Sequence, residues 1–160
     1  MKVYLILFVA LLTPCSSFAA DTPEPYPANN QLYFTNDGVN ENYSGKLISL
    51  EGQILRIEPG PQSKPMYQIR LPVPLLKNVW VASLMVHKKA EYEAGQIIRA
   101  MGYLQPVAND DKWTQSVTKD RFHILGFCFL NVTTLKGTYL PAGVKQCEGW
   151  QSGKQPSELM

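Results

Sequence analysis

The sequence has few of the residues from which catalytic and metal sites are usually built. Only two histidines, His87 and His123, occur among 160 residues, and Asp110-Asp111 is an isolated acidic pair. No Gly-x-Ser-x-Gly or Cys-x-x-Cys motif is present, and the remaining carboxylates are scattered. A single histidine near a strand is more often a surface or hydrogen-bonded residue than a metal ligand. We therefore expect no enzymatic activity, no metal site and no cofactor.

Long hydrophobic runs are also scarce, and the only one lies at the N-terminus. It predicts a cleavable secretory signal peptide over residues 1–19, with Lys2 at its start and an unbroken apolar run from Val3 to Leu12. The small residues after Pro14 favour cleavage after Ala19. A spanning helix needs about 20 apolar residues, so an uncleaved anchor is the less favoured alternative. We expect a periplasmic or secreted protein with no membrane span after signal cleavage.

Positive and negative side chains are nearly equal in number once the signal peptide is removed. The full chain has 15 Lys+Arg and 13 Asp+Glu, and the signal carries one basic residue, Lys2, and no acidic one, which leaves a net charge of +1. Arg56, Arg70 and Arg99 are spread over separate strand candidates rather than gathered in one groove. Binding of nucleic acid depends on neutralising phosphates with clustered cations. The composition therefore disfavours a nucleic-acid ligand.

Cysteine is rare, and its placement indicates one disulfide. Cys15 leaves with the signal, and Cys128 and Cys147 remain as an even pair in an oxidising compartment. A bond across these 19 positions would stabilise the fold by about 3 kcal/mol. Catalytic or metal-binding thiols are the alternative, but nothing around either cysteine favours them over a structural disulfide.

One central domain lies between two terminal segments that are rich in turn-forming residues. Alternating prolines and Asn/Asp/Gly clusters predict an extended lead-in over residues 20–44, in which Leu32, Tyr33 and Phe34 are suited to docking on the domain. We expect residues 151–160 to form a polar, flexible tail. About 140 residues remain after the signal, which suits one domain over residues 45–150.

Strand patterns dominate this domain. Apolar alternation or continuous apolar runs predict strands over residues 46–58, 67–71, 79–86, 98–104 and 122–132. Gly52 lies where the apolar parity of the first stretch changes, which indicates a bulge or bend. Residues 87–94 are the only convincing helical stretch and are closed by Gly95, whereas residues 105–120 form a polar loop. The pattern predicts an all-β sandwich or small barrel.

This order of elements resembles the OB-fold, the oligonucleotide- and oligosaccharide-binding barrel, over residues 45–132. Gly52 in the first strand, the short helix before the fourth strand, and the segment from Gly95 to Leu104 carry the resemblance. It implies an all-β, five-stranded OB-like barrel with one short helix and an extended N-terminal lead-in. It also implies a binding face on the second and third strands, framed by residues 59–65 and 106–119. The ligand-contact candidates on and around this face are Arg56, Tyr67, Arg70, Trp80, Tyr103 and Trp113.

Two of these aromatic residues have competing interpretations. Tyr67 shares the parity of Ile69 and Leu71, which favours the core. Trp113, in a polar loop, is the best candidate for stacking on a sugar ring, but it could equally fold back over the barrel mouth. We predict an exported, non-catalytic binding module for a glycan or another envelope protein. The alternatives are an accessory subunit of an envelope assembly, contacted through the lead-in, and a single-strand nucleic-acid binder, which is the less favoured.

Overall fold

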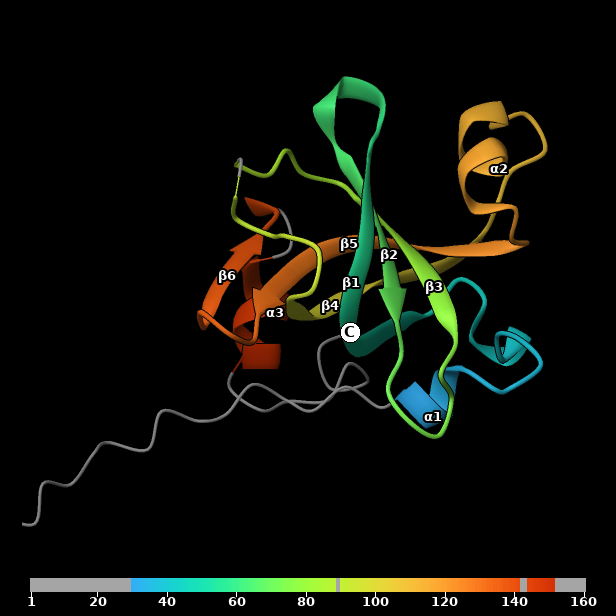
Figure 1. Cartoon of the computed structure of the whole chain (residues 1–160), viewed down its shortest axis with the longest axis horizontal. Coiled ribbons are helices and arrows are strands. Elements are labelled where there is room, and N and C mark those ends of the chain that lie inside the picture. The colour runs from blue at the N-terminus through green and yellow to red at the C-terminus, as the bar shows by residue number, and fades with distance from the viewer. Residues whose placement is uncertain (1–29, 89, 142–143, 152–160) are drawn as a thin grey trace, which may run out of the picture.

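The computed structural model describes residues 30–88, 90–141 and 144–151. The strands form one sheet in the order β3-β2-β1-β4-β5-β6, and parallel pairing of β3 with β5 closes the first five into a barrel (Figure 1). The fold is therefore the five-stranded OB-like barrel that the sequence predicts, with one additional strand. The strands are β1 (Leu47–Pro59), β2 (Pro65–Arg70), β3 (Asn78–Ser83), β4 (Ile97–Pro106), β5 (Phe122–Asn131) and β6 (Lys136–Tyr139).

The long first strand serves two neighbours, as the position of Gly52 predicts. Residues 47–53 of β1 pair with β4, and residues 53–59 pair with β2. The change of partner falls beside Gly52, and a register shift follows between Ile54 and Arg56. A Cβ on Gly52 would lie 2.4 Å from the carbonyl oxygen of Arg70, so the backbones approach too closely for a side chain. The predicted bend is confirmed.

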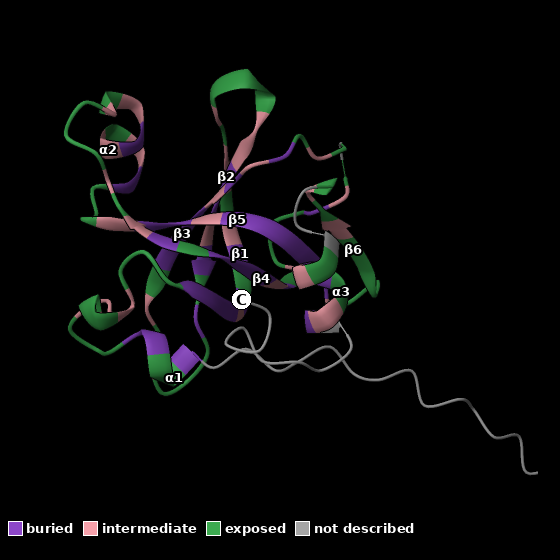
Figure 2. Cartoon of the chain, turned by 180° about the vertical axis from the view of Figure 1, so that it is seen from behind, coloured by how far each residue is buried: buried purple, intermediate pink, exposed green. Residues whose placement is uncertain are grey.

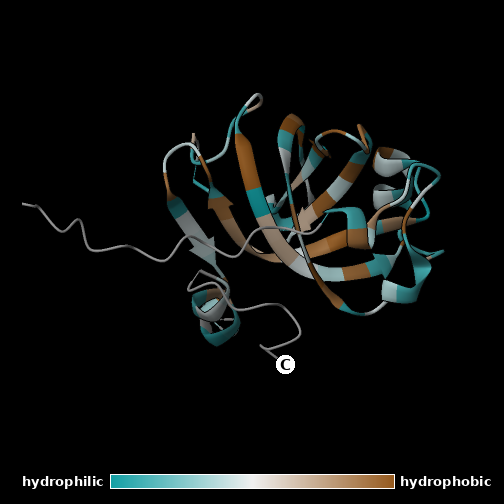
Figure 3. Ribbon diagram, turned by 90° about the horizontal axis from the view of Figure 1, so that it is seen from below, coloured by the Kyte–Doolittle hydropathy of each residue, from teal (hydrophilic) through white to brown (hydrophobic). Residues whose placement is uncertain are grey.

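Two apolar clusters lie on opposite sides of the barrel wall. The larger fills the interior and includes Ile48, Ile69, Val81 and Phe129. Buried residues lie mainly along the barrel strands, whereas the tip of the β1–β2 hairpin is exposed (Figure 2). Hydrophobic and hydrophilic residues alternate along the strands (Figure 3), which is the period-two pattern that allowed the strands to be predicted.

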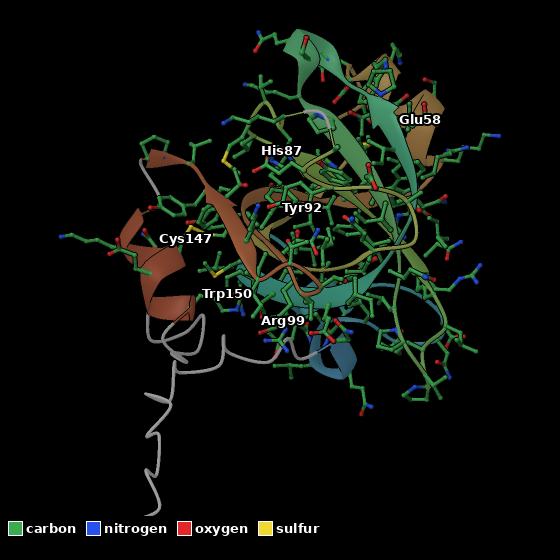
Figure 4. The ribbon with its side chains drawn as sticks, turned by 60° about the vertical axis from the view of Figure 1, so that its left-hand side comes forward. Glu58, His87, Tyr92, Arg99, Cys147 and Trp150 are labelled. Atoms are coloured by element: carbon green, nitrogen blue, oxygen red, sulfur yellow. A yellow bond between two sulfur atoms is a disulfide. The ribbon has the colours of Figure 1, made fainter. Side chains whose placement is uncertain are left out.

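The second cluster lies outside the barrel, beneath the helix α3 (Val144–Gln151). Cys128 on β5 and Cys147 on α3 form the predicted disulfide, with their Cα atoms 5.7 Å apart. Trp150 on the same helix, labelled in Figure 4, is fully buried. It belongs to the same apolar cluster as Met101 of β4. Strand β5 is therefore covered on both faces, which explains its nearly continuous apolar sequence. Neither β6 nor α3 was predicted from the sequence.

Residues 30–44 dock onto the barrel. They contain α1 (Asn30–Tyr33), an isolated bridge between Phe34 and Val39, and the 3-10 turn η1 (Glu41–Tyr43). The Asn30 side chain donates to the carbonyl oxygen of Glu51 at 2.8 Å and accepts from its N–H at 3.0 Å, like a neighbouring strand. Tyr33 and Phe34 are buried, as expected, but Leu32 is exposed. The predicted signal peptide and the first part of the lead-in lie outside the described residues.

The predicted helix over residues 87–94 is wrong. The described residues between β3 and β4 form turns, and Ala90 has a left-handed φ of 66°. His87 and Tyr92 point into the barrel, with their ring centroids 4.8 Å apart (Figure 4). A helix of eight residues is marginal by itself, so these interior contacts decide the conformation. The helix between strands is instead α2 (Lys112–Thr118), which lies within the stretch predicted as a loop.

Candidate functional site

A cleft of about 280 Å³ lies between the β1–β2 turn and α2. The hairpin tip and α2 project from the same end of the barrel and form its two walls (Figure 1). Its floor is the outer surface of β2, β3 and β5, where Met66, Ala82 and Leu125 lie in register. The two loops that the OB-fold resemblance selects from the sequence thus border one cavity. We call it the hairpin cleft.

The hairpin wall is held in one conformation by its turn. Gln62 (φ 56°, ψ 30°) and Ser63 (φ 59°) are both left-handed, and the Lys64 N–H donates to the Pro61 carbonyl oxygen at 3.2 Å. This is the geometry of a type I′ hairpin turn, which normally takes Asn-Gly. Prolines at 59, 61 and 65 restrict the backbone further. The cleft therefore has a rigid wall that presents the Gln62 and Lys64 side chains.

The opposite wall is the first turn of α2. Asp111 caps this helix by accepting from the Thr114 N–H at 2.9 Å and the Thr114 hydroxyl at 2.6 Å. These hydrogen bonds hold the pKa of the Asp111 carboxyl below its usual range. Because both carboxylate oxygens accept from Thr114, Asp111 has a structural role in shaping the cleft.

Trp113 follows that cap and is the aromatic residue of the cleft. It is half-buried, and its ring lies against Gly60, where an added Cβ would be 3.4 Å from the indole Cη2. The ring therefore reaches from α2 to the hairpin while part of its surface stays open. Trp113 therefore packs against the end of the barrel and also lines the cavity, and its stacking on a sugar ring stays a prediction.

His123, at the start of β5, lies in the floor of the cleft. Its side chain is only 7 % exposed, and its Nδ1 has no hydrogen-bond partner among the described residues. Burial lowers the pKa of His123, while the nearby Asp111 carboxylate acts in the opposite direction. A neutral imidazole with one unpaired nitrogen is therefore kept at the base of the site. The sequence contains no indication of this burial, because it results from packing in the folded chain.

The structure brings together only some of the six predicted contact residues. Trp113 alone lines the cleft. The Arg56 guanidinium lies 5.1 Å from the ring centre of Trp80, but Trp80 is 2 % exposed and offers no open face to this cleft. Arg56 also pairs with Glu58 at 2.9 Å (Figure 4 labels Glu58). These two predicted residues form a structural pair beside the site.

The other three predicted residues lie away from the cleft. Tyr67 is in the core, as its parity indicates, and hydrogen-bonds to His87. Arg70 is exposed at the end of β2 opposite the hairpin tip, about 17 Å along the strand from Pro65. Tyr103 is stacked on Phe127, with ring centroids 5.7 Å apart, and does not line the cleft. Gln62, Lys64 and His123 are cleft residues that the sequence did not single out.

No protein-family model matches this chain, and no curated protein matches it. The described part of the chain contains no group of three or more His, Cys, Asp and Glu side chains that could hold a metal ion. Within the same residues, no helix has the length and apolar character needed to cross a membrane.

Proposed function

We propose that this protein is an exported, non-catalytic binding module that takes a hydroxyl-rich ligand, such as a glycan chain, in the hairpin cleft. The observation that carries the proposal is the half-open Trp113 ring beside Gln62, Lys64 and His123 in one cavity. Sugar recognition uses an apolar ring face for stacking and nearby donors and acceptors for hydroxyl groups. The engagement of Asp111 with Thr114 favours binding over acid–base chemistry.

The disulfide supports the export part of the proposal. Cys128 and Cys147 are both buried and bonded, and such bonds persist mainly in oxidising compartments. This is compatible with a periplasmic or extracellular location, in line with the signal peptide that the sequence predicts. Nucleic acid remains disfavoured, since Lys64 is the only Lys or Arg among the residues that line the cleft.

The three tryptophans allow a direct test. Trp113 lines the hairpin cleft, Trp80 lines a different cavity, and Trp150 is buried beneath α3. In protein labelled with 5-fluorotryptophan, titration with a β-1,4-linked N-acetylglucosamine tetramer should move the ¹⁹F resonance of Trp113 and saturate. The Trp80 and Trp150 resonances should stay in place.

A matched pair of variants distinguishes the loss of ring stacking in the cleft from a general effect of removing an aromatic side chain. Trp113→Ala should weaken binding of the tetramer roughly tenfold, since an aromatic contact is worth about 1–1.5 kcal/mol. Tyr103→Ala removes a half-exposed aromatic side chain outside the cleft and should leave the affinity unchanged. A static Trp113 resonance, or equal losses in the two variants, contradicts the proposal.

The alternative function, contact with an envelope protein through the lead-in, has its own test. Tyr33 and Phe34 belong to the barrel core, so deletion of the whole lead-in would damage the fold itself. Deletion of residues 21–29 alone keeps Tyr33 and Phe34 in the chain. If a captured envelope protein is lost on that deletion but retained by Trp113→Ala, the accessory-subunit function is favoured.

A further inference from the structure

Strand β6 forms an open edge of the sheet. It pairs with β5 on one side, and no other described strand pairs with it. The pairing of β3 with β5 closes the barrel without β6, so β6 stays outside the closed part of the sheet. Figure 1 shows it on the side of the barrel opposite α2. An edge strand presents backbone N–H and C=O groups that can pair with a further strand.

The backbone groups that point outward from β6 are those of Gly137 and Tyr139. The Leu140 N–H donates to the Phe127 carbonyl oxygen at 2.9 Å, and the register of β6 on β5 is continuous. Because hydrogen-bonded positions alternate along an antiparallel pair, Thr138 also faces β5. Gly137 and Tyr139 therefore face away from β5, and neither forms a backbone hydrogen bond to another described element. Both residues are exposed.

The side chains of β6 leave this edge accessible. Proteins commonly protect an edge strand with proline, a bulge or charged residues. Strand β6 contains no proline, its pairing with β5 has no register shift, and its only charged residue is Lys136 at one end. The Thr138 hydroxyl is hydrogen-bonded to Glu91 and Tyr92, so this side chain is held away from the edge. A further strand can therefore approach β6 along its backbone.

A second copy of β6 fits this edge in one antiparallel register. With a twofold axis at Thr138, Gly137 lies opposite Tyr139 of the partner subunit, and each such pair exchanges two backbone hydrogen bonds. This register forms two complete pairs. An axis at Gly137 or at Tyr139 forms only one, because the next outward positions are Leu135, a turn residue with a φ of 54°, and Pro141, which has no N–H.

The side chains match in the same register. Lys136 lies opposite Leu140 of the partner subunit, so the two ammonium groups do not face each other. Tyr139 is on the outer face of the sheet, because it lies opposite Cys128 of the outer apolar cluster. In the register centred on Thr138, its ring covers Gly137 of the partner subunit, which has no side chain of its own. An aromatic residue opposite an edge glycine stabilises strand pairing.

We propose that β6 is a dimer interface, at which two copies of this protein join their sheets edge to edge with the twofold axis at Thr138. Four backbone hydrogen bonds and two tyrosine rings form a small interface, so the dimer is weak. Because β6 and α2 lie on opposite sides of the barrel (Figure 1), both hairpin clefts stay open in the dimer.

Sedimentation equilibrium of the protein without its predicted signal peptide tests the interface. Between about 10 µM and about 1 mM, the average mass should rise from that of a monomer toward that of a dimer. Tyr139→Ala should weaken the dimer at least about tenfold, because two rings are lost by symmetry. Tyr139 and Tyr103 are 39 % and 38 % exposed, so Tyr103→Ala is the matched control and should dimerise like the unaltered protein.

Gly137→Pro tests the backbone pairing itself. Proline is tolerated in an edge strand where its nitrogen faces outward, so this variant keeps the hydrogen bonds to β5 and removes one outward N–H from each copy. The dimer should weaken at least about tenfold. Its near-ultraviolet circular dichroism should match that of the unaltered protein.

A cysteine at the twofold axis identifies the register. Residues that lie opposite each other at a position without hydrogen bonds have Cα atoms about 4.5 Å apart, which a disulfide can span. With oxidised glutathione as oxidant, Thr138→Cys should form an intermolecular disulfide. Thr133→Cys, exposed in the turn before β6, should not.

Three results would overturn the proposal: a monomer up to about 1 mM, Gly137→Pro and Tyr139→Ala variants that dimerise like Tyr103→Ala, or equal cross-linking of the two cysteine variants. None of these measurements uses a glycan. The dimer and the proposed function can therefore fail separately.

Discussion

Gly52 shows how a single residue determines the path of a strand. An added Cβ would lie 2.4 Å from the Arg70 carbonyl oxygen and 2.6 Å from Ile69 Cγ2, and backbone atoms cannot move aside cheaply. Gly52→Ala should therefore lower the free energy of unfolding by about 2–3 kcal/mol, measured by urea titration. At Gly38 an added Cβ would meet nothing within 4 Å, so Gly38→Ala serves as the control and should change stability by about 0.5 kcal/mol or less. Equal effects would show that β1 does not bend here.

His87 is the residue that should give stability its pH dependence. Its Nδ1 accepts from the Tyr67 hydroxyl, while its Nε2 donates to the Ser83 hydroxyl oxygen at 3.0 Å, since Ser83 itself donates to the Met85 carbonyl at 2.9 Å. This neutral state has no place for a second proton. Burial lowers the pKa of His87 from 6.5 to about 4, and Glu91 opposes this only in part.

Stability should accordingly fall with acidification. Between pH 6.5 and about 4 the unfolded chain binds a proton at His87 that the folded chain does not, so the contribution is complete above pH 6.5 and is lost below it. Because the side chain is only partly buried, we expect a loss of about 1–2 kcal/mol. In His87→Phe the urea midpoint should depend less on pH, and the slope that remains comes from His123 and from the Glu91 and Asp111 carboxyls, whose pKa values are also lowered. An unchanged slope would contradict this assignment.

The β1–β2 turn is an element that stores backbone strain next to the hairpin cleft. A left-handed residue other than glycine costs roughly 1–2 kcal/mol, and Ser63 occupies the position that glycine takes in most type I′ turns. Ser63→Gly should raise the free energy of unfolding by about 0.5–1 kcal/mol, after the greater freedom of glycine in the unfolded chain is included. Gly60, at the same turn, has no positive φ. Gly60→Ala should instead lower the free energy of unfolding, because its Cβ would lie 2.2 Å from the Lys64 carbonyl oxygen. A loss of stability in Ser63→Gly would show that this turn is not strained.

Strands and bends could be predicted where the pattern that marks them lies within a short stretch of sequence. Alternation of side chains or a continuous apolar run marks each barrel strand, and the glycine in β1 marks its bend, because these patterns depend on neighbours in the sequence. The predicted helix over residues 87–94 is wrong because the interior contacts of the buried Tyr92 and the partly buried His87 outweigh the helical propensity of a short segment. Strand β6 and α3 were missed because the sequence of β6, Lys-Gly-Thr-Tyr, has no alternation, and because packing on β5 through the disulfide fixes α3.

The residues of the candidate site likewise include some that could be predicted from the sequence and some that could not. Trp113 and the loops around it could be selected from fold resemblance, since the ends of strands fix where loops gather. His123 could not, because its burial results from packing in the folded chain and leaves no pattern in the local sequence. Trp80 and Tyr67 were selected as aromatic residues on the expected face. The parity of Tyr67 already favoured the core, whereas only the packed structure shows that Trp80 is buried.

On the scale of the whole molecule, the disulfide joins the C-terminal helix to the barrel. Cys128 and Cys147 lie among Met101, Leu130 and Trp150, a cluster that is separate from the barrel interior. In the mature protein, a maleimide should label no thiol under native conditions. Cys128→Ala/Cys147→Ala should lower the free energy of unfolding by about 3 kcal/mol, because the unfolded chain loses a constraint across 19 positions.

The destabilisation that follows removal of the disulfide should be confined to α3. Without the bond, α3 is held only by its apolar contacts, so the ¹⁹F resonance of Trp150 should broaden or shift at urea concentrations below the main transition. The Trp80 and Trp113 resonances, which report on β3 and on the hairpin cleft, should keep their native positions there. Simultaneous loss of all three signals would show that α3 and the barrel unfold as one cooperative unit, and quantitative labelling of Cys128 in the native protein would exclude the bond itself.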